Sequence, residues 1–224
     1  MQYLIWDVDG TLYPSTPEGK KLLEEIYAQK VKEELRIDFE KAKAWFKTKK
    51  MLYKSSTLTF LALSIGPLKE VAEYFDKTFA EKIPIKKDPK LIELFEKLKN
   101  YQHYALRNGT LKGTYRILKR LGLDQIKWKG CEFGPFKKVW ATLDTMGVPK
   151  PHPAVFEYVR TYLFLKEKGR FPKSEKEARK FAQKILMIGD RKEVDLEPAR
   201  RLGMNGALVL NYTSLLRNFK RLLR

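Results

Sequence analysis

Cysteine is almost absent from this chain, in which Cys131 is the only one among 224 residues. A single thiol excludes an internal disulfide and a cysteine-based metal site, and we interpret it as typical of a reducing, cytoplasmic compartment. Long apolar runs are also absent, since no stretch approaches the roughly 18 residues that span a bilayer. The N-terminus has no basic stretch followed by an apolar run, so no signal peptide is expected.

Acidic residues are outnumbered, with 27 Asp and Glu against 46 Lys and Arg and a net charge of +19. The excess is concentrated in residues 160–224, which carry 17 basic and 7 acidic residues. Such a field attracts anions, whether small phosphates, nucleic acid or an acidic membrane surface. A Lys-rich surface without any polyanionic partner explains the charge equally well, and no nucleic-acid motif accompanies it. The scarcity of Asn and Gln beside abundant Lys and Glu is typical of thermophilic proteins.

Hydrophobic residues make up 43% of the chain, enough for a sizeable core. Their spacing predicts an all-helical segment over residues 13–87, with helices near 39–53, 56–64 and 67–82. Elsewhere strands alternate with helices, which predicts an α/β fold: a Rossmann-like parallel sheet with helices on both faces. The expected domains are therefore a core domain of residues 1–12 and 88–224, and an inserted helical domain of residues 13–87.

The individual elements of the α/β part follow from the same patterns. We expect strands at 3–6, at 101–106, near 126–131, in "ILMIGD" and in "GALVL". Helices are expected at 112–121, 136–146, 153–168 and 174–184. The last segment, "SLLRNFKRLLR", is a basic amphipathic helix that we expect to pack its apolar face on the core, with binding to an anionic membrane or nucleic acid as the alternative.

Polar side chains gather where the predicted strands end. In parallel sheets ligands bind beyond the carboxyl ends of the strands, so these residues are candidates for a site. They are Asp7, Asp9, Arg107, Asn108, Lys150, Asp190 and Asp195.

Three motifs among these residues share an order and spacing with a known family. They are "DVDGT" at 7–11, "KPHPAVF" at 150–156 and "ILMIGDRKEVD" at 185–195. With them the chain resembles the haloacid dehalogenase-like (HAD) hydrolase superfamily, in particular its capped phosphatase branch, and "GTLYP" at 10–14 is reminiscent of its nucleotidase-like members. The resemblance covers the whole chain and implies that residues 13–87 form a cap domain.

The resemblance implies a role for each motif residue. Asp7 would be the nucleophile that forms an aspartyl-phosphate, and Asp9 would protonate the leaving alcohol and later activate water. Lys150 would neutralise Asp7 and the incoming phosphate. A Mg²⁺ cofactor would be held by the oxygen ligands it prefers: Asp7, the backbone carbonyl of Asp9, Asp190 and Asp195.

Asp9 distinguishes between branches of the superfamily. Its dehalogenases lack an acid at this position, because a halide leaving group needs no proton. The presence of Asp9 favours phosphoryl transfer, either to water or, in a phosphotransferase or mutase, to another acceptor.

The second motif departs from the family pattern. Its strand normally ends in Thr or Ser, but "YALRNGT" places Arg107 there. A guanidinium also binds phosphate through charge-assisted hydrogen bonds, so we assign Arg107 and Asn108 to phosphate binding. Alternatively, Arg107 fills the phosphate pocket or pairs with Asp7, or Thr110 supplies the hydroxyl from a shifted turn.

The sequence therefore predicts an enzyme, a Mg²⁺-dependent phosphatase that hydrolyses a small phosphomonoester such as a nucleoside monophosphate or a sugar phosphate. The alternative is a catalytically weak HAD-like protein that binds a partner or nucleic acid through its basic surface.

Overall fold

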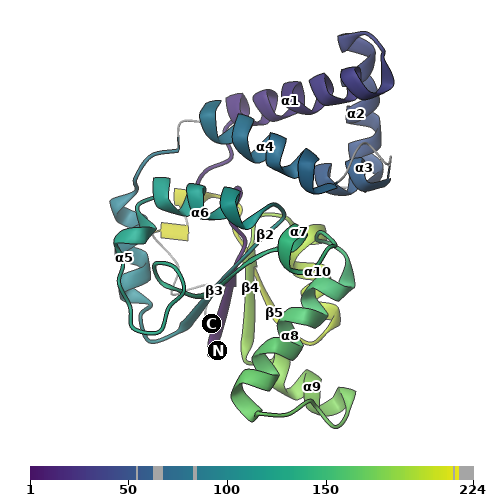
Figure 1. Ribbon diagram of the computed structural model, residues 1–224. Coiled ribbons are helices and arrows are strands. Elements are labelled where there is room, and N and C mark those ends of the chain that lie inside the picture. Colours follow the sequence, from purple (N-terminus) through teal and green to yellow (C-terminus); the bar gives the residue numbers. More distant parts are fainter. Residues whose placement is uncertain (54, 63–67, 83–84, 214, 217–224) are drawn as a thin grey trace.

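One parallel sheet organises the molecule (Figure 1). The computed structural model describes residues 1–53, 55–62, 68–82, 85–213 and 215–216. The strands lie in the order β3-β2-β1-β4-β5, and their bounds are β1 Tyr3–Trp6, β2 Gln102–Arg107, β3 Phe136–Ala141, β4 Ile185–Gly189 and β5 Asn205–Leu208. The predicted Rossmann-like α/β fold is confirmed.

Both faces of the sheet are covered by helices, because successive side chains of a strand point to opposite faces. Leu4 and Trp6 of β1 belong to the core cluster beneath α5 (Pro89–Lys97) and α6 (Leu111–Arg120). Tyr3 and Ile5 belong to the cluster on the other face, beneath three further helices: α8 (Pro153–Lys168), α9 (Glu175–Ala182) and α10 (Glu197–Arg201). The central strand is thereby buried along its whole length, and its end is fixed in space.

Between β1 and α5 the described residues form four helices, a separate group that we term the helical insert. They are α1 (Pro17–Leu35), α2 (Phe39–Tyr53), α3 (Ser56–Ala62) and α4 (Leu68–Lys82). The insert has a core of its own, built around the rings of Tyr27, Phe46, Phe60 and Phe75. Figure 1 shows it beyond the edge of the sheet at which β1 ends, the edge where the candidate residues were expected.

The third strand is where the predictions were wrong. Residues 126–131 form no strand, and the predicted helix at 136–146 is strand β3 followed by the short helix α7 (Thr142–Thr145). Phe136, Val139 and Trp140 have the spacing of a helical face, but all three are buried in a strand that pairs with β2. Phe136 and Val139 belong to the same core cluster because the pairing of β3 with β2 is irregular between Phe136 and Lys138, and the resulting spacing was mistaken for that of a helix.

Only the first part of the C-terminal amphipathic segment lies within the described residues. Leu215 is buried in the core cluster on the α5 face, and Leu216 packs against that cluster. Residues 217–224, on which the rest of that prediction depends, lie outside the described residues. Among the helices the structure describes, none combines the length and the apolar character needed to cross a membrane.

Candidate active site

Asp7 lies directly after β1 and is buried, although it carries a carboxylate. Its Oδ1 accepts a hydrogen bond from Lys150 Nζ at 2.6 Å, and its Oδ2 accepts one from the Thr11 hydroxyl at 3.0 Å. A buried carboxylate is costly unless it is paired and hydrogen-bonded, and both conditions are met here. The strand end therefore presents a paired, oriented carboxyl group.

Lys150 is fully buried between two carboxylates. Its Nζ donates to Asp7 and, at 2.7 Å, to Asp195 Oδ1, and also lies 3.2 Å from the carbonyl oxygen of Leu106. Burial by itself lowers the pKa of Lys150, but Asp195 and Asp7 outweigh it and raise the pKa above its ordinary value. The ammonium stays charged and links the end of β1 to the helical turn Lys192–Leu196 that follows β4.

Asn108 holds the loop that carries Lys150. Its side-chain Nδ2 donates to the Lys150 carbonyl at 2.9 Å, and its Oδ1 accepts from the Lys150 amide at 2.8 Å and from the Thr142 hydroxyl at 3.2 Å. The side chain that the sequence assigned to phosphate binding is thus used to position Lys150.

Three carboxylates could hold a metal ion. Oxygens of Asp7, Asp190 and Asp195 all lie within 4.8 Å of one another. Asp190 Oδ1 is buried without a hydrogen-bond partner, and the nearest cation, Arg191 Nε, is 3.7 Å away. Burial and then the Asp7 carboxylate raise the pKa of Asp190 to about 7, the behaviour of an acid whose negative charge is not neutralised.

The backbone makes room for this cluster at Gly10. A Cβ at Gly10 would lie 2.4 Å from Asp190 Oδ2, and the residue has a φ of +86°, so only glycine is accommodated there. The hard oxygen donors and the unpartnered oxygen of Asp190 fit a small divalent cation.

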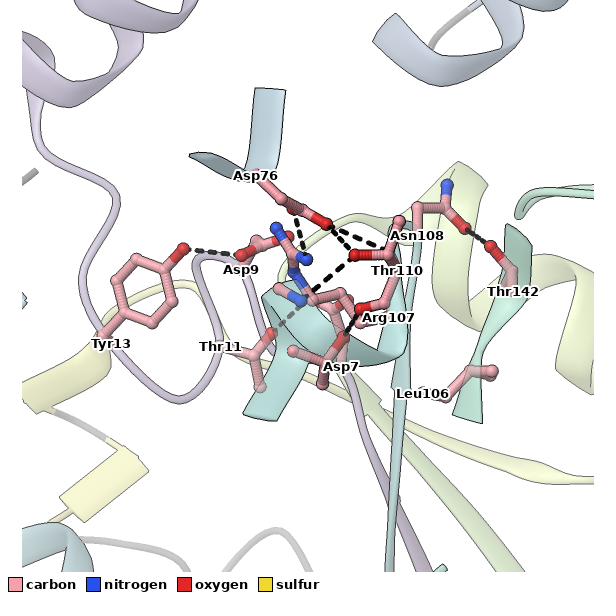
Figure 2. Close-up of polar contacts among 12 residues, drawn as sticks. Asp7, Asp9, Thr11, Tyr13, Asp76, Leu106, Arg107, Asn108, Thr110 and Thr142 are labelled. Carbon is pink, nitrogen blue, oxygen red and sulfur yellow. Dashed lines mark hydrogen bonds and ion pairs between the residues drawn. The ribbon is translucent and has the colours of Figure 1, made fainter. Parts of the chain in front are cut away.

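Asp9 points away from the carboxylate cluster, toward the helical insert. Its Oδ1 accepts a hydrogen bond from the Tyr13 hydroxyl at 2.6 Å, and its Oδ2 accepts one from Arg107 Nε at 2.8 Å (Figure 2). The side chain is about a third exposed, more than that of any other acid in the site. Asp9 is therefore the acid that a ligand outside the cluster can reach.

Arg107 lies at the end of β2 and does not pair with Asp7. It joins Asp9 to Asp76, a residue of α4 whose Oδ1 accepts from Arg107 Nη1 at 2.7 Å (Figure 2). Burial by itself lowers the pKa of Arg107, but the carboxylates of Asp76 and Asp9 outweigh burial and raise the pKa above its ordinary value. Thr110, the other candidate at this motif, caps α6 and donates its hydroxyl to Asp76 at 2.6 Å.

Asp76 and Thr11 were missed by the sequence analysis. Asp76 directly follows Phe75 and lies one turn after Ala72, and all three side chains are buried. An acid on the apolar face of a helix costs free energy unless it has a partner, and that pattern could have revealed Asp76. No pattern identifies its partner, since Arg107 is 31 residues away along the chain.

A cavity of about 730 Å³ opens between this site and the helical insert. Asp9, Arg107, Asn108 and Asp190 line it from the sheet side. From the insert and its connections come aromatic rings and exposed lysines, including Tyr13, Tyr27, Phe60, Phe75, Lys20, Lys86 and Lys87. The predicted site residues thus come together beside one pocket, with Asp7, Lys150 and Asp195 buried behind it.

The family follows from a comparison of the whole sequence. The model of the haloacid dehalogenase-like hydrolase family matches residues 1–203. The chain belongs to this family. No curated protein matches the sequence.

Solved structures of other HAD proteins share this fold at low sequence identity. A HAD phosphatase from Thermococcus onnurineus is 19% identical over 93% of this chain and 86% of its own, with a TM-score of 0.53. The magnesium-bound structure of YfnB from Bacillus subtilis, described as a HAD hydrolase, gives 18% identity, the same coverages and a TM-score of 0.53. A 2-haloacid dehalogenase from Pseudomonas syringae is 17% identical over 99% of both chains, with a TM-score of 0.51. The HAD fold is thus shared by phosphatases and dehalogenases alike.

Proposed function

We propose that this HAD hydrolase is a Mg²⁺-dependent phosphatase that hydrolyses a small phosphomonoester. The observation that carries the proposal is the pairing of two different acids after one strand. Asp7 is buried and paired with the Lys150 ammonium, which suits a nucleophile, whereas Asp9 is accessible from the cavity, which suits a proton donor. The helical insert would be the cap that covers both.

In the first step Asp7 attacks the phosphorus atom. A bond forms between a carboxylate oxygen and phosphorus, the bond from phosphorus to the ester oxygen breaks, and a proton from Asp9 goes to the departing alcohol. Lys150 stabilises the carboxylate before attack and the phosphoryl oxygens after it. Its contact with Asp195 keeps the ammonium in place throughout.

In the second step water replaces Asp7 on phosphorus. Asp9, now ionised, accepts a proton from the water, and the resulting oxygen attacks the aspartyl-phosphate, so that phosphate leaves and the Asp7 carboxylate is regenerated. The same acid therefore donates a proton and then takes one back.

Asp7, Asp190, Asp195 and the backbone carbonyl of Asp9 would hold the Mg²⁺. When bound, the ion neutralises phosphoryl oxygens during transfer. The magnesium in the YfnB structure supports this assignment. It is also supported by the oxygen of Asp190 that lacks a hydrogen-bond partner.

Arg107 and the backbone of Asn108 would bind the phosphate from the end of β2. Arg107 lines the cavity, and no hydrogen bond from its Nη2 is found among the described residues. The aromatic lining and the volume of the cavity suit a nucleoside monophosphate or a sugar phosphate. The accessible acid Asp9 favours this reaction over dehalogenation, which needs no proton donor.

The first test is phosphate release from p-nitrophenyl phosphate and a panel of metabolites, with Mg²⁺ and with EDTA. We expect turnover with Mg²⁺ only, and we expect Asp7→Asn to lower kcat by at least about 10³-fold, because the neutral amide is a poor nucleophile. Circular dichroism and the melting temperature would show that the variant is folded. The absence of any hydrolysis by the wild type would contradict the proposal.

A second candidate function is partner binding with little hydrolysis, and the double pairing of Arg107 favours it. The Arg107→Thr variant separates the two, because it restores the hydroxyl that the family normally has. If Arg107 binds phosphate, the variant raises KM by about tenfold. A gain of activity over an inactive wild type would instead identify Arg107 as the residue that blocks the site.

A further inference from the structure

Arg107 connects the helical insert to the proposed proton donor. One edge of its guanidinium contacts Asp9 and the other contacts Asp76 of α4. The side chains of Arg107 and Asp76 are only 6% and 8% exposed, so this ion pair is shielded from solvent. A shielded pair is strong only when its geometry is good and its remaining oxygens are satisfied.

The remaining oxygen of Asp76 is satisfied at the start of α6. Its Oδ2 accepts hydrogen bonds from the Thr110 amide at 3.0 Å and from the Thr110 hydroxyl at 2.6 Å. The positive end of the α6 dipole favours a carboxylate at this place. Every oxygen of Asp76 is therefore held by the α/β part of the molecule.

Two glycines leave the space that these contacts require. A Cβ at Gly109 would lie 2.4 Å from Arg107 Nη1, and a Cβ at Gly113 would lie 2.1 Å from Asp76 Oδ2. The surface that receives Asp76 thus has glycines beside the side chains of the ion pair and hydrogen-bond donors from Thr110 for the remaining oxygen.

We propose that Asp76 is a positioning residue for the phosphatase reaction, which it serves by fixing Arg107 so that Arg107 makes a single contact with Asp9. The proton donor is then aligned only while the insert is seated on the sheet. This inference rests on the proposed function.

The physical reason lies in the preferred geometry of arginine. A guanidinium beside one carboxylate turns to bind both of its oxygens through two parallel hydrogen bonds. Here Nη1 is held by Asp76, and only Nε reaches Asp9. Without the Asp76 charge, Arg107 would turn so that Nη2 joins Nε on Asp9 and competes for Oδ1 with the Tyr13 hydroxyl. Asp9 would then be directed toward Arg107 instead of toward the leaving group.

The test compares Asp76→Asn with Glu73→Gln, using p-nitrophenyl phosphate and Mg²⁺. Asparagine keeps the size of Asp76 and an oxygen for the Thr110 amide but removes the charge. Glu73 lies on the same helix and is exposed, so its variant is the matched control. We expect Asp76→Asn to lower kcat about tenfold or more, with a rise in KM as well because Nη2 turns from the phosphate to Asp9, and Glu73→Gln to leave both unchanged. A raised KM with an unchanged kcat would mean that Asp76 only fastens the insert, which overturns the inference.

A double-mutant cycle tests whether Asp76 acts through Arg107. Arg107→Lys also loses the two-sided contact, so the double variant Asp76→Asn with Arg107→Lys should be no slower than the slower single variant. If the loss of kcat in the double variant equals the product of the losses in the two single variants, the inference is overturned. This holds even if Asp76→Asn folds poorly, because kcat is calculated for each variant from its concentration of folded protein. A wild type without turnover refutes the proposed function instead, whereas an active wild type with a neutral Asp76→Asn refutes only this inference.

Discussion

At the scale of the single residue, His103 shows how burial fixes a charge state. The ring lies in β2, where Nδ1 accepts a hydrogen bond from the Trp6 indole at 3.1 Å and Nε2 donates to the Leu98 carbonyl at 2.9 Å. Both nitrogens are satisfied in the neutral form only, since a protonated ring has no acceptor for Trp6. Burial accordingly lowers the pKa of His103 to about 4.

This depressed pKa makes stability dependent on pH. Between pH 6.5 and 4 the unfolded chain binds a proton at His103 that the folded protein does not bind, so this contribution to stability is present above 6.5 and is lost as the pH falls to 4. The loss amounts to about 3 kcal/mol. Urea unfolding at pH 7, 5.5 and 4.5 should give a shallower pH dependence for His103→Gln than for the wild type. Equal slopes for the two proteins would contradict the argument.

At the scale of the element, α6 contains Gly113, although the helical backbone there does not require a glycine. Replacing a helical Gly by Ala ordinarily stabilises a helix, by up to about 1 kcal/mol in its interior, and Gly113 lies in the first turn of α6. At Gly113, however, the new Cβ would meet Asp76 Cγ at 2.2 Å, so either α4 or α6 must move. The sign of the effect should therefore reverse.

We predict that Gly113→Ala destabilises the protein by about 1–3 kcal/mol, the usual cost of overpacking. It should also lower kcat on p-nitrophenyl phosphate, because it displaces Asp76. Lys112→Ala, at an exposed position of the same helix, is the matched control and should change neither quantity. Urea unfolding and steady-state kinetics measure both, and a stabilised Gly113→Ala would show that the contact between α4 and α6 is not close in solution.

The elements also show how far the sequence could lead. β1 and β4 were predicted because a short apolar run ends in Asp-Val-Asp-Gly in one case and Gly-Asp in the other, and those ends carry most of the site. β3 was not predicted, because the irregular pairing after Phe136 interrupts the alternation that marks a strand. The contact of Asp76 with Arg107 could not be predicted either, since it depends on how α4 settles on α6 and not on any local pattern.

At the scale of the whole molecule, the apolar residues fall into separate clusters. Two lie on the faces of the sheet, and the third lies within the helical insert. Among the described residues, α4 meets the α/β part through a buried polar contact, the pairing of Asp76 with Arg107 and Thr110. A polar contact between two apolar cores allows one part to open while the other stays folded.

Phe46→Ala tests this independence. The ring is buried in the insert, stacked on Tyr27 at 4.8 Å between centroids and close to Phe60. Its removal should cost about 3–5 kcal/mol, because the cavity can close only partly. In hydrogen exchange followed by mass spectrometry, we expect faster exchange in α1–α4 and unchanged exchange in β1 and β4. In kinetic assays we expect a loss of turnover, because Asp76 leaves Arg107. Phe156→Ala, in the cluster of the α8 face, should instead speed exchange in the strands, since it weakens the sheet's own core. Uniformly faster exchange in Phe46→Ala would mean that insert and sheet unfold as one unit, and that the insert cannot leave the active site without unfolding the protein.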